Sequence, residues 1–259
     1  MRRVLTALVL LPLLYLFISR LPSGYFLLLV AILGALAMGE FLHMYHRGWA
    51  ESIAGALAGG LMLLALAQGP PMGIGAATAL ATVLLLWRLL SNPPQQALKD
   101  LAPWAVGLLY IPLMLTWQVK LREAGPQWVL LLYATVWSGD TLALYAGTLL
   151  GRHSLYSRVS PKKTVEGALG SLAGGAAAAL VLEALLGTAL GYPRAAFLGL
   201  LMGAAAVGGD LVESMFKRDA GVKDSSRLIP GHGGLLDKLD GSLLAGPLLY
   251  GLLRLLGAL

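Results

Sequence analysis

The chain has 259 residues, of which 58% are hydrophobic and 12% charged, and its mean hydropathy is +0.76. A soluble domain usually carries about twice that charged fraction, so the composition excludes an ordinary soluble protein. The net charge of +6 is scattered among short segments, which argues against a nucleic-acid-binding surface, and the absence of cysteine excludes disulfides and thiolate metal sites.

Apolar runs recur along the chain, and each is long enough to cross a bilayer as a helix. The runs are continuous rather than alternating, which favours a helical bundle over a barrel, because backbone groups in lipid must be paired internally. The sequence therefore predicts an all-α, polytopic integral membrane bundle with about nine transmembrane helices. The predicted spans are 3–19, 24–43, 52–68, 73–91, 104–118, 127–149, 168–190, 195–213 and 235–257.

The chain divides into two regions within one integrated membrane domain. Residues 1–125 are expected to supply about five transmembrane helices, and residues 126–259 a catalytic region of about four, with two cytoplasmic active-site loops. The start of the chain resembles a signal peptide, but residues 20–22 offer no small-residue cleavage site, so we expect a retained first helix.

The basic residues predict the orientation. With a cytoplasmic N-terminus, fourteen of the 19 lysines and arginines fall on the cytoplasmic side and five on the other, as the positive-inside rule requires. Segments 152–163 and 217–238 carry this bias, because without them the count is five against five. We expect a multi-pass protein of the cell (inner or plasma) membrane with cytoplasmic active-site loops.

In the first region, Glu40, His43 and His46 are spaced to share one helical face near the end of a predicted span. Such a set could bind a metal, but we expect a solvent-exposed helix end at the membrane interface.

The proline-containing segment 92–103 is expected to be a connector rather than a short interfacial helix.

Two runs of glycine and alanine occur within predicted spans, at residues 54–60 and 170–179. Small residues allow helix backbones to approach closely in a membrane. We therefore expect both runs to serve helix packing rather than chemistry.

Residues 209–241 form the most densely charged part of the chain. Asp210 and Glu213 lie at the end of one predicted span, Asp237 and Asp240 lie at the start of the next, and a basic loop separates them. Carboxylates three residues apart lie on similar helix faces, and gathered carboxylates repel one another unless a cation joins them. Oxygen ligands without sulfur favour Mg²⁺, which proteins usually share with substrate phosphates. The alternative is that the last two aspartates cap a helix and pair with basic neighbours.

A second polar set lies upstream. Asp140 is deep in the sixth predicted span, where a charge is costly and functional by default, although neighbouring hydroxyls could simply hold it. The segment 160–167, SPKKTVEG, places lysines and hydroxyls at the start of a span, which suits phosphate binding but also a positive-inside flank. Two spans separate segment 160–167 from the acidic stretch, so both polar sets fall on one side of the membrane.

His232, in the loop before Asp237, could be an acid, a base, a phosphate contact or a solvated turn residue.

Together these residues resemble the CDP-diacylglycerol synthase (phosphatidate cytidylyltransferase) family. The family signature is matched, with its spacing, by Ser214, Lys217-Arg218, Lys223-Asp224, the segment 230–234 and Asp237-Lys238-Leu239-Asp240. The segment 160–167 and the pair Asp140-Thr141 also match, so the resemblance is specific over about 134–245 and general elsewhere.

The sequence departs from the family pattern at a few positions. Lys238 stands where the family usually has an arginine, which keeps the charge but loses bidentate phosphate geometry. Leu144 and Gly147-Thr148 stand where the family commonly has a tyrosine and a Gly-Arg pair.

The resemblance implies transfer of the cytidylyl group of CTP to phosphatidate, giving CDP-diacylglycerol and pyrophosphate, in phospholipid biosynthesis. It implies Mg²⁺, with a second cation such as K⁺. Catalysis of this kind is mostly positioning and charge neutralisation. The implied partners are CTP, phosphatidate and the lipid bilayer, with no nucleic acid, and the family suggests a homodimer.

The expected site residues have three kinds of role. Catalysis is expected from Asp210, Lys217, Asp237 and Asp240, whose three aspartates would hold the metal. Substrate binding is expected from Ser160, Lys162, Lys163, Thr164, Ser214, Arg218, Lys223, His232, Gly233, Gly234 and Lys238. Further site positions are Asp140, Glu166, Glu213 and Asp224.

Other functions stay open from the sequence alone. A cytidylyltransferase for an ether-lipid phosphate or a polyprenyl phosphate would look the same, because chain selectivity lies in apolar contacts. An ion-coupled transporter using Asp140 and Asp210 is a distant alternative, since the chain has no repeated halves and the basic loop would be unexplained. A CDP-alcohol phosphatidyltransferase is disfavoured because its Asp-Gly-x-x-Ala-Arg element is missing.

Overall fold

The computed structural model describes residues 15–45, 48–91, 93–188, 190–226 and 233–259. Within these ranges, seven helical segments are long and apolar enough to cross a membrane, and the predicted all-α polytopic class is confirmed. The elements are α2 (Ser23–Met44), α3 (Trp49–Ala67), α4 (Pro70–Ser91), η1 (Pro94–Gln96), α5 (Ala97–Tyr110), α6 (Pro112–Ala124), α7 (Pro126–Leu150), β1 (Ser154–Tyr156), β2 (Ser160–Thr164), α8 (Val165–Leu186), α9 (Tyr192–Asp219) and α10 (Leu236–Leu255). Most of the predicted first span lies outside the described residues.

The segment expected to be a proline-containing connector is largely helical, so that prediction was wrong. Pro94 begins η1 and Pro112 begins α6, positions where the missing N–H of proline would have no intrahelical partner. Pro112 also has no N–H to donate to the carbonyl oxygen of Leu108, which interrupts the helical hydrogen bonds between α5 and α6. The two helices together form one membrane-crossing segment, Pro94–Ala124.

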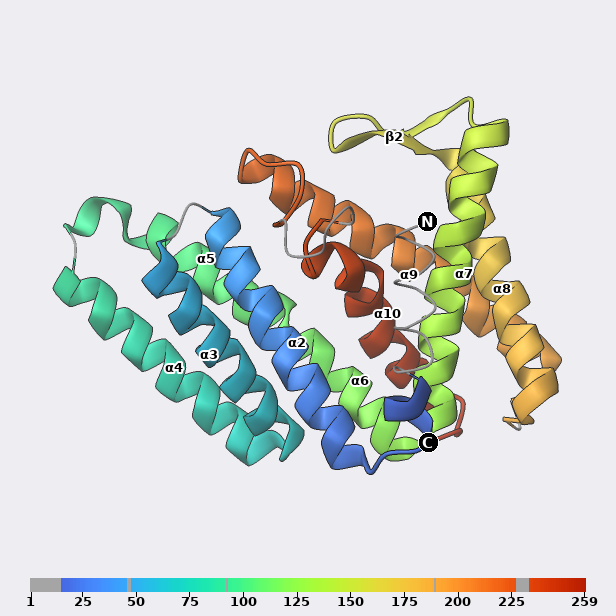
Figure 1. Ribbon diagram of the computed structural model, residues 1–259, viewed down its shortest axis with the longest axis horizontal. Helices are drawn as coiled ribbons and strands as arrows, with labels where there is room; N and C mark the ends of the chain where they lie inside the picture. Colours follow the sequence, from blue (N-terminus) through green and yellow to red (C-terminus); the bar gives the residue numbers. More distant parts are fainter. Residues whose placement is uncertain (1–14, 46–47, 92, 189, 227–232) are drawn as a thin grey trace.

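A short antiparallel hairpin, which the sequence did not predict, joins α7 to α8. Ser154 pairs with Thr164 and Tyr156 with Ser160. Figure 1 shows this hairpin standing beyond the ends of α7 and α8. At its end, the Thr164 hydroxyl accepts a hydrogen bond from the N–H of Gly167 and caps α8. The cap fixes how the basic strand β2 enters the helix.

The last helix, α10, packs against α2 and α6 on one side and against α7 and α9 on the other (Figure 1). One hydrophobic core joins both parts of the chain, and it includes the fully buried side chains of Phe41, Leu132 and Leu243. Because α10 touches both groups of helices, residues at its start lie where the two groups meet.

The small-residue runs serve close packing, as expected. A Cβ atom at Gly175 of α8 would run into the carbonyl oxygen of Gly199 in α9, so only glycine allows this crossing. In the first run, a Cβ atom at Gly59 of α3 would lie 2.8 Å from Cβ of Met38 in α2.

Candidate active site

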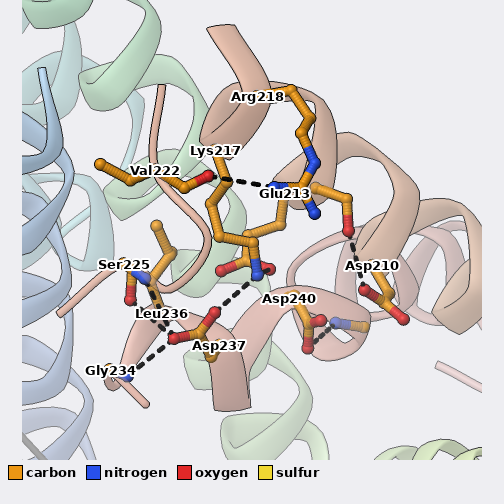
Figure 2. Close-up of polar contacts among 12 residues, drawn as sticks. Asp210, Glu213, Lys217, Arg218, Val222, Ser225, Gly234, Leu236, Asp237 and Asp240 are labelled. Carbon is orange, nitrogen blue, oxygen red and sulfur yellow. Dashed lines mark hydrogen bonds and ion pairs between the residues drawn. The ribbon is translucent and has the colours of Figure 1, made fainter. Parts of the chain in front are cut away.

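Three carboxylates from two helices gather at one point of the bundle. Asp210 and Glu213 extend from α9 and Asp240 from the first turns of α10, and one oxygen of each lies within 4.8 Å of the others. Figure 2 shows them facing one another across the two helices. The approach depends on Gly209, since a Cβ atom there would meet the carbonyl oxygen of Asp240. We refer to Asp210, Glu213 and Asp240 as the acidic cluster.

Lys217 stands beside this cluster. Its Nζ lies 2.5 Å from Oε2 of Glu213 and 2.6 Å from Oδ1 of Asp237. The sequence predicted Lys217 and Arg218 in a loop, but both lie in the last turn of α9, so Lys217 follows Glu213 by one helical turn. Glu213 is 1% exposed, and apart from this ion pair neither of its oxygens accepts a hydrogen bond from the described residues.

Asp237 is held by several donors. Besides Lys217, its carboxylate accepts hydrogen bonds from the N–H of Gly234 at 2.7 Å and from the N–H and hydroxyl of Ser225 at 3.2 and 3.0 Å. Figure 2 shows these contacts converging on one side chain. The sequence grouped Asp237 with Asp210 and Asp240, whereas the three carboxylates that gather are those of Asp210, Glu213 and Asp240. Asp237 and Glu213 share Lys217 as a partner.

The basic hairpin reaches the acidic cluster. Nζ of Lys163, at the end of β2, lies 2.7 Å from Oδ2 of Asp210. A cavity of about 310 Å³ opens beside this pair, and its walls include Asp140, Lys162 and Thr164. The two polar stretches that are far apart in sequence therefore meet in one site.

Apart from Lys238, the positions at which the chain departs from the family pattern lie in the wall of the same cavity. Leu144, Gly147 and Thr148 of α7 all line it. A Cβ atom at Gly147 would come within 3.2 Å of the Thr164 hydroxyl, so α7 and the start of α8 are close here. These departures change the shape and polarity of the cavity rather than a remote surface.

Several expected site residues have structural partners. Ser214 donates to Oδ1 of Asp210 at 3.4 Å, one turn away on α9. Arg218 donates to the carbonyl oxygens of Val159 and Val222 and so ties the hairpin to the end of α9. Glu166 lies 2.6 Å from Nδ1 of His153 across the base of the hairpin.

The remaining expected residues differ in exposure, and none of those described lines the cavity. Ser160 is partly buried on β2, and Lys223, Asp224 and Lys238 are exposed. Gly233 has a φ of +85°, a backbone conformation that favours glycine, and it leads directly to the Gly234 N–H that binds Asp237. His232 lies outside the described residues.

Sequence reasoning missed the role of Glu40. This residue is buried and not part of a solvent-exposed helix end, and its carboxylate contacts Ser225 and Ser226, which lie far from it in sequence. An acidic residue within an apolar span was the available signal. Its neighbour Tyr45, just past α2, donates to Oδ2 of Asp219 at 2.9 Å, and burial together with this bond raises the pKa of the phenol.

Comparison with known proteins identifies the family of the chain. A model of the cytidylyltransferase family matches residues 1–256. A phosphatidate cytidylyltransferase of Synechocystis sp. is 33% identical over 264 residues, covering 89% of this chain and 88% of the relative. Proteins of the same name from Staphylococcus saprophyticus and Brucella abortus are 31% and 36% identical, covering 88% and 78% of this chain and 90% and 71% of the relatives. The chain therefore belongs to the cytidylyltransferase family.

Proposed function

We propose that this protein transfers the cytidylyl group of CTP to phosphatidate, producing CDP-diacylglycerol and pyrophosphate. The observation that carries the proposal is the Lys163–Asp210 contact, which joins a basic phosphate-binding strand to a carboxylate cluster beside a cavity. The names of the relatives, all phosphatidate cytidylyltransferases, support the choice of substrates.

The acidic cluster suits a hard cation. Its ligand atoms are all carboxylate oxygens, and apart from the ion pair with Lys217 the oxygens of Glu213 have no hydrogen-bond donor among the described residues. Mg²⁺ prefers such oxygen ligands and keeps positions for substrate phosphates. We propose that Asp210 and Asp240 hold Mg²⁺ with a third carboxylate from Glu213 or Asp237, and that a second cation such as K⁺ binds nearby. When bound, the metal would neutralise charge on the reacting phosphates.

The protein's own residues would position the reactants. Lys162 and Lys163 line the cavity and would bind the triphosphate, while Lys217 stays fixed between Glu213 and Asp237 and presents positive charge to the phosphates. A phosphatidate oxygen would bond to the α-phosphorus of CTP as the bond from that phosphorus to the pyrophosphate oxygen breaks. The lipid phosphate is already ionised, so no strong general base is required.

The rest of the substrate-binding set would surround this centre. Thr164 lines the cavity and Ser214 contacts Asp210, so both offer hydroxyls there, with Ser160 at the start of β2. Gly233 and Gly234, just before α10, complete the proposed set. We propose that Arg218, Lys223 and Lys238 guide anionic substrates electrostatically, and that His232, which lies outside the described residues, also contacts substrate.

We further propose that the site opens to the cytoplasm from the cell membrane. The head group of phosphatidate would meet CTP at that surface, with its acyl chains between the helices. The homodimer that the family suggests is part of this proposal, and sedimentation in detergent would test it.

The test is a transfer assay with purified protein in detergent, phosphatidate, radiolabelled CTP and Mg²⁺. We expect lipid-soluble label from the wild type, and a loss of about 100-fold or more in Asp240→Asn, as for other electrostatic groups in active sites. The matched control is Glu123→Gln, which removes a carboxylate beside Lys120 at the α6–α7 end of the bundle, and it should keep full activity. If label appears only with a polyprenyl phosphate or an ether-lipid phosphate, that lipid phosphate and not phosphatidate is the acceptor.

A further inference from the structure

The carboxylate of Glu40, on α2, binds the start of α10. One oxygen accepts hydrogen bonds from the hydroxyl of Ser226 at 2.6 Å and the N–H of Leu235 at 3.0 Å. The other accepts from the N–H of Leu236 at 3.0 Å and lies 3.2 Å from the hydroxyl of Ser225. Three donors thus converge on a single buried side chain, and the Ser225 hydroxyl, which has one hydrogen for both Glu40 and Asp237, lies within reach.

These contacts replace a cap that the helix lacks. The first N–H groups of any helix have no partner within it and need acceptors elsewhere. The residue at the N-cap of α10 is Leu235, whose side chain cannot accept a hydrogen bond. Glu40 satisfies two of these N–H groups, and its negative charge suits the positive end of the helix dipole.

The same carboxylate connects to the active site. The hydroxyl of Ser225 lies between Glu40 and Asp237, at 3.2 and 3.0 Å, and Asp237 binds Lys217, which contacts Glu213 of the acidic cluster. The packing is close, because a Cβ atom at Gly234 would meet both the Ser225 hydroxyl and a Glu40 oxygen.

We propose that Glu40 is a positioning residue, which sets α10 so that Asp237 and Asp240 face α9 in the arrangement that binds cation and substrate. The effect of Glu40 on turnover rests on the proposed function. Glu40 touches neither the cavity wall nor the acidic cluster, so it would act through Ser225 and the backbone of α10. Groups that orient metal ligands in this way typically contribute about 10- to 100-fold to metal affinity or activity.

The experiment compares wild type, Glu40→Gln and the control Glu123→Gln by hydrogen exchange with mass spectrometry and by transfer kinetics. The amide of Glu40→Gln keeps the size of the side chain but turns a donor toward groups that need an acceptor. We expect faster exchange in peptides covering residues 233–240 and unchanged exchange in α7 and α8. We also expect kcat to fall about 10- to 100-fold and the Mg²⁺ concentration for half-maximal rate to rise.

Ser225→Ala and the double variant complete the test. If Glu40 acts through Ser225, the two substitutions together should cost less than the product of their separate effects. Equal exchange in wild type and Glu40→Gln would overturn the proposal, and so would faster local exchange with unchanged kcat and Mg²⁺ requirement. Faster exchange throughout the chain would indicate a general loss of stability and would also overturn it. A wild type that does not transfer label to phosphatidate would refute the proposed function, while the exchange comparison would still decide whether Glu40 holds α10.

Discussion

Two carboxylates lie beside Lys217, but their surroundings differ. Asp237 is surrounded by donors from Ser225 and Gly234, whereas Glu213 has the lysine alone among the described hydrogen-bonding groups. A carboxylate already bound to several donors has less free coordination capacity for a metal. The geometry therefore favours Glu213 as the third ligand, with Asp237 holding Lys217 in place.

Glu213→Gln and Asp237→Asn should separate these roles. We expect Glu213→Gln to raise the Mg²⁺ concentration for half-maximal rate about tenfold or more, because it weakens a ligand. Asp237→Asn should mainly lower kcat, because Lys217 loses one of its two partners. The measurement is the transfer rate as a function of Mg²⁺ concentration, and the reverse pattern would place Asp237 in the metal set.

Residue type and spacing pointed to the acidic and basic stretches that meet in the structure, but not to the hydrogen-bond partners of each side chain. The pattern of aspartates and lysines near 210–240 indicated metal and phosphate chemistry. It did not indicate that Asp237 would be held by Ser225, because both lie in or beside a turn whose shape the pattern does not specify. Glu40 lies 195 residues before Leu235, and no local rule relates two positions at that separation.

Between α9 and α10, the site depends on how closely two helices approach. Gly209 faces the backbone of Asp240, whereas at Gly208 an added Cβ atom would find Leu244 Cδ1 at 3.8 Å, an ordinary contact. An alanine side chain would therefore fit at Gly208 but not at Gly209, although alanine is the better helix former at both positions.

Gly209→Ala should push α10 away from α9, separating Asp240 from Asp210. We expect a loss of activity of at least about tenfold and a lower melting temperature, since close-packed helices tolerate added volume poorly. Gly208→Ala should leave both unchanged or slightly raise the melting temperature. Transfer rates and thermal unfolding of the two variants in one detergent give the comparison, and similar behaviour of both would contradict the packing argument.

The elements were predictable to the extent that each follows from a continuous apolar run. Those runs gave the approximate positions of α2, α3, α4, α7, α8 and α9. The β1–β2 hairpin was missed because it is short and polar, so it carries no hydrophobic alternation. The end of α9 was placed too early, because the polar residues after 213 were assigned to a loop and not to a helix extending beyond the apolar core.

Across the whole molecule, the Lys163–Asp210 contact places the hairpin and the start of α10 at one end of the bundle. The α6–α7 connection lies at the other end, since α7 runs the length of the bundle from there to the hairpin (Figure 1). If the basic end faces the cytoplasm, the positive-inside rule is satisfied.

The lack of cysteine allows a direct test of this orientation. Single cysteines at Ser157 in the hairpin turn and at Glu123 near the end of α6 report opposite ends of the bundle. In intact cells, a membrane-impermeant maleimide should label Glu123→Cys, and it should label Ser157→Cys only after permeabilisation. The opposite result would place the site outside the cell and exclude cytoplasmic CTP as its substrate.

The bond between Glu40 and the start of α10 also has a consequence for biogenesis. The acceptor is synthesised near the beginning of the chain and its donors near the end, with most of the membrane helices between them. During insertion, the carboxylate on α2 gains these hydrogen-bond donors only when the last helix is in place. Because Asp240 is on the same last helix, the acidic cluster and the contact that positions α10 form at the same late stage, and a partly translated protein holds no finished site.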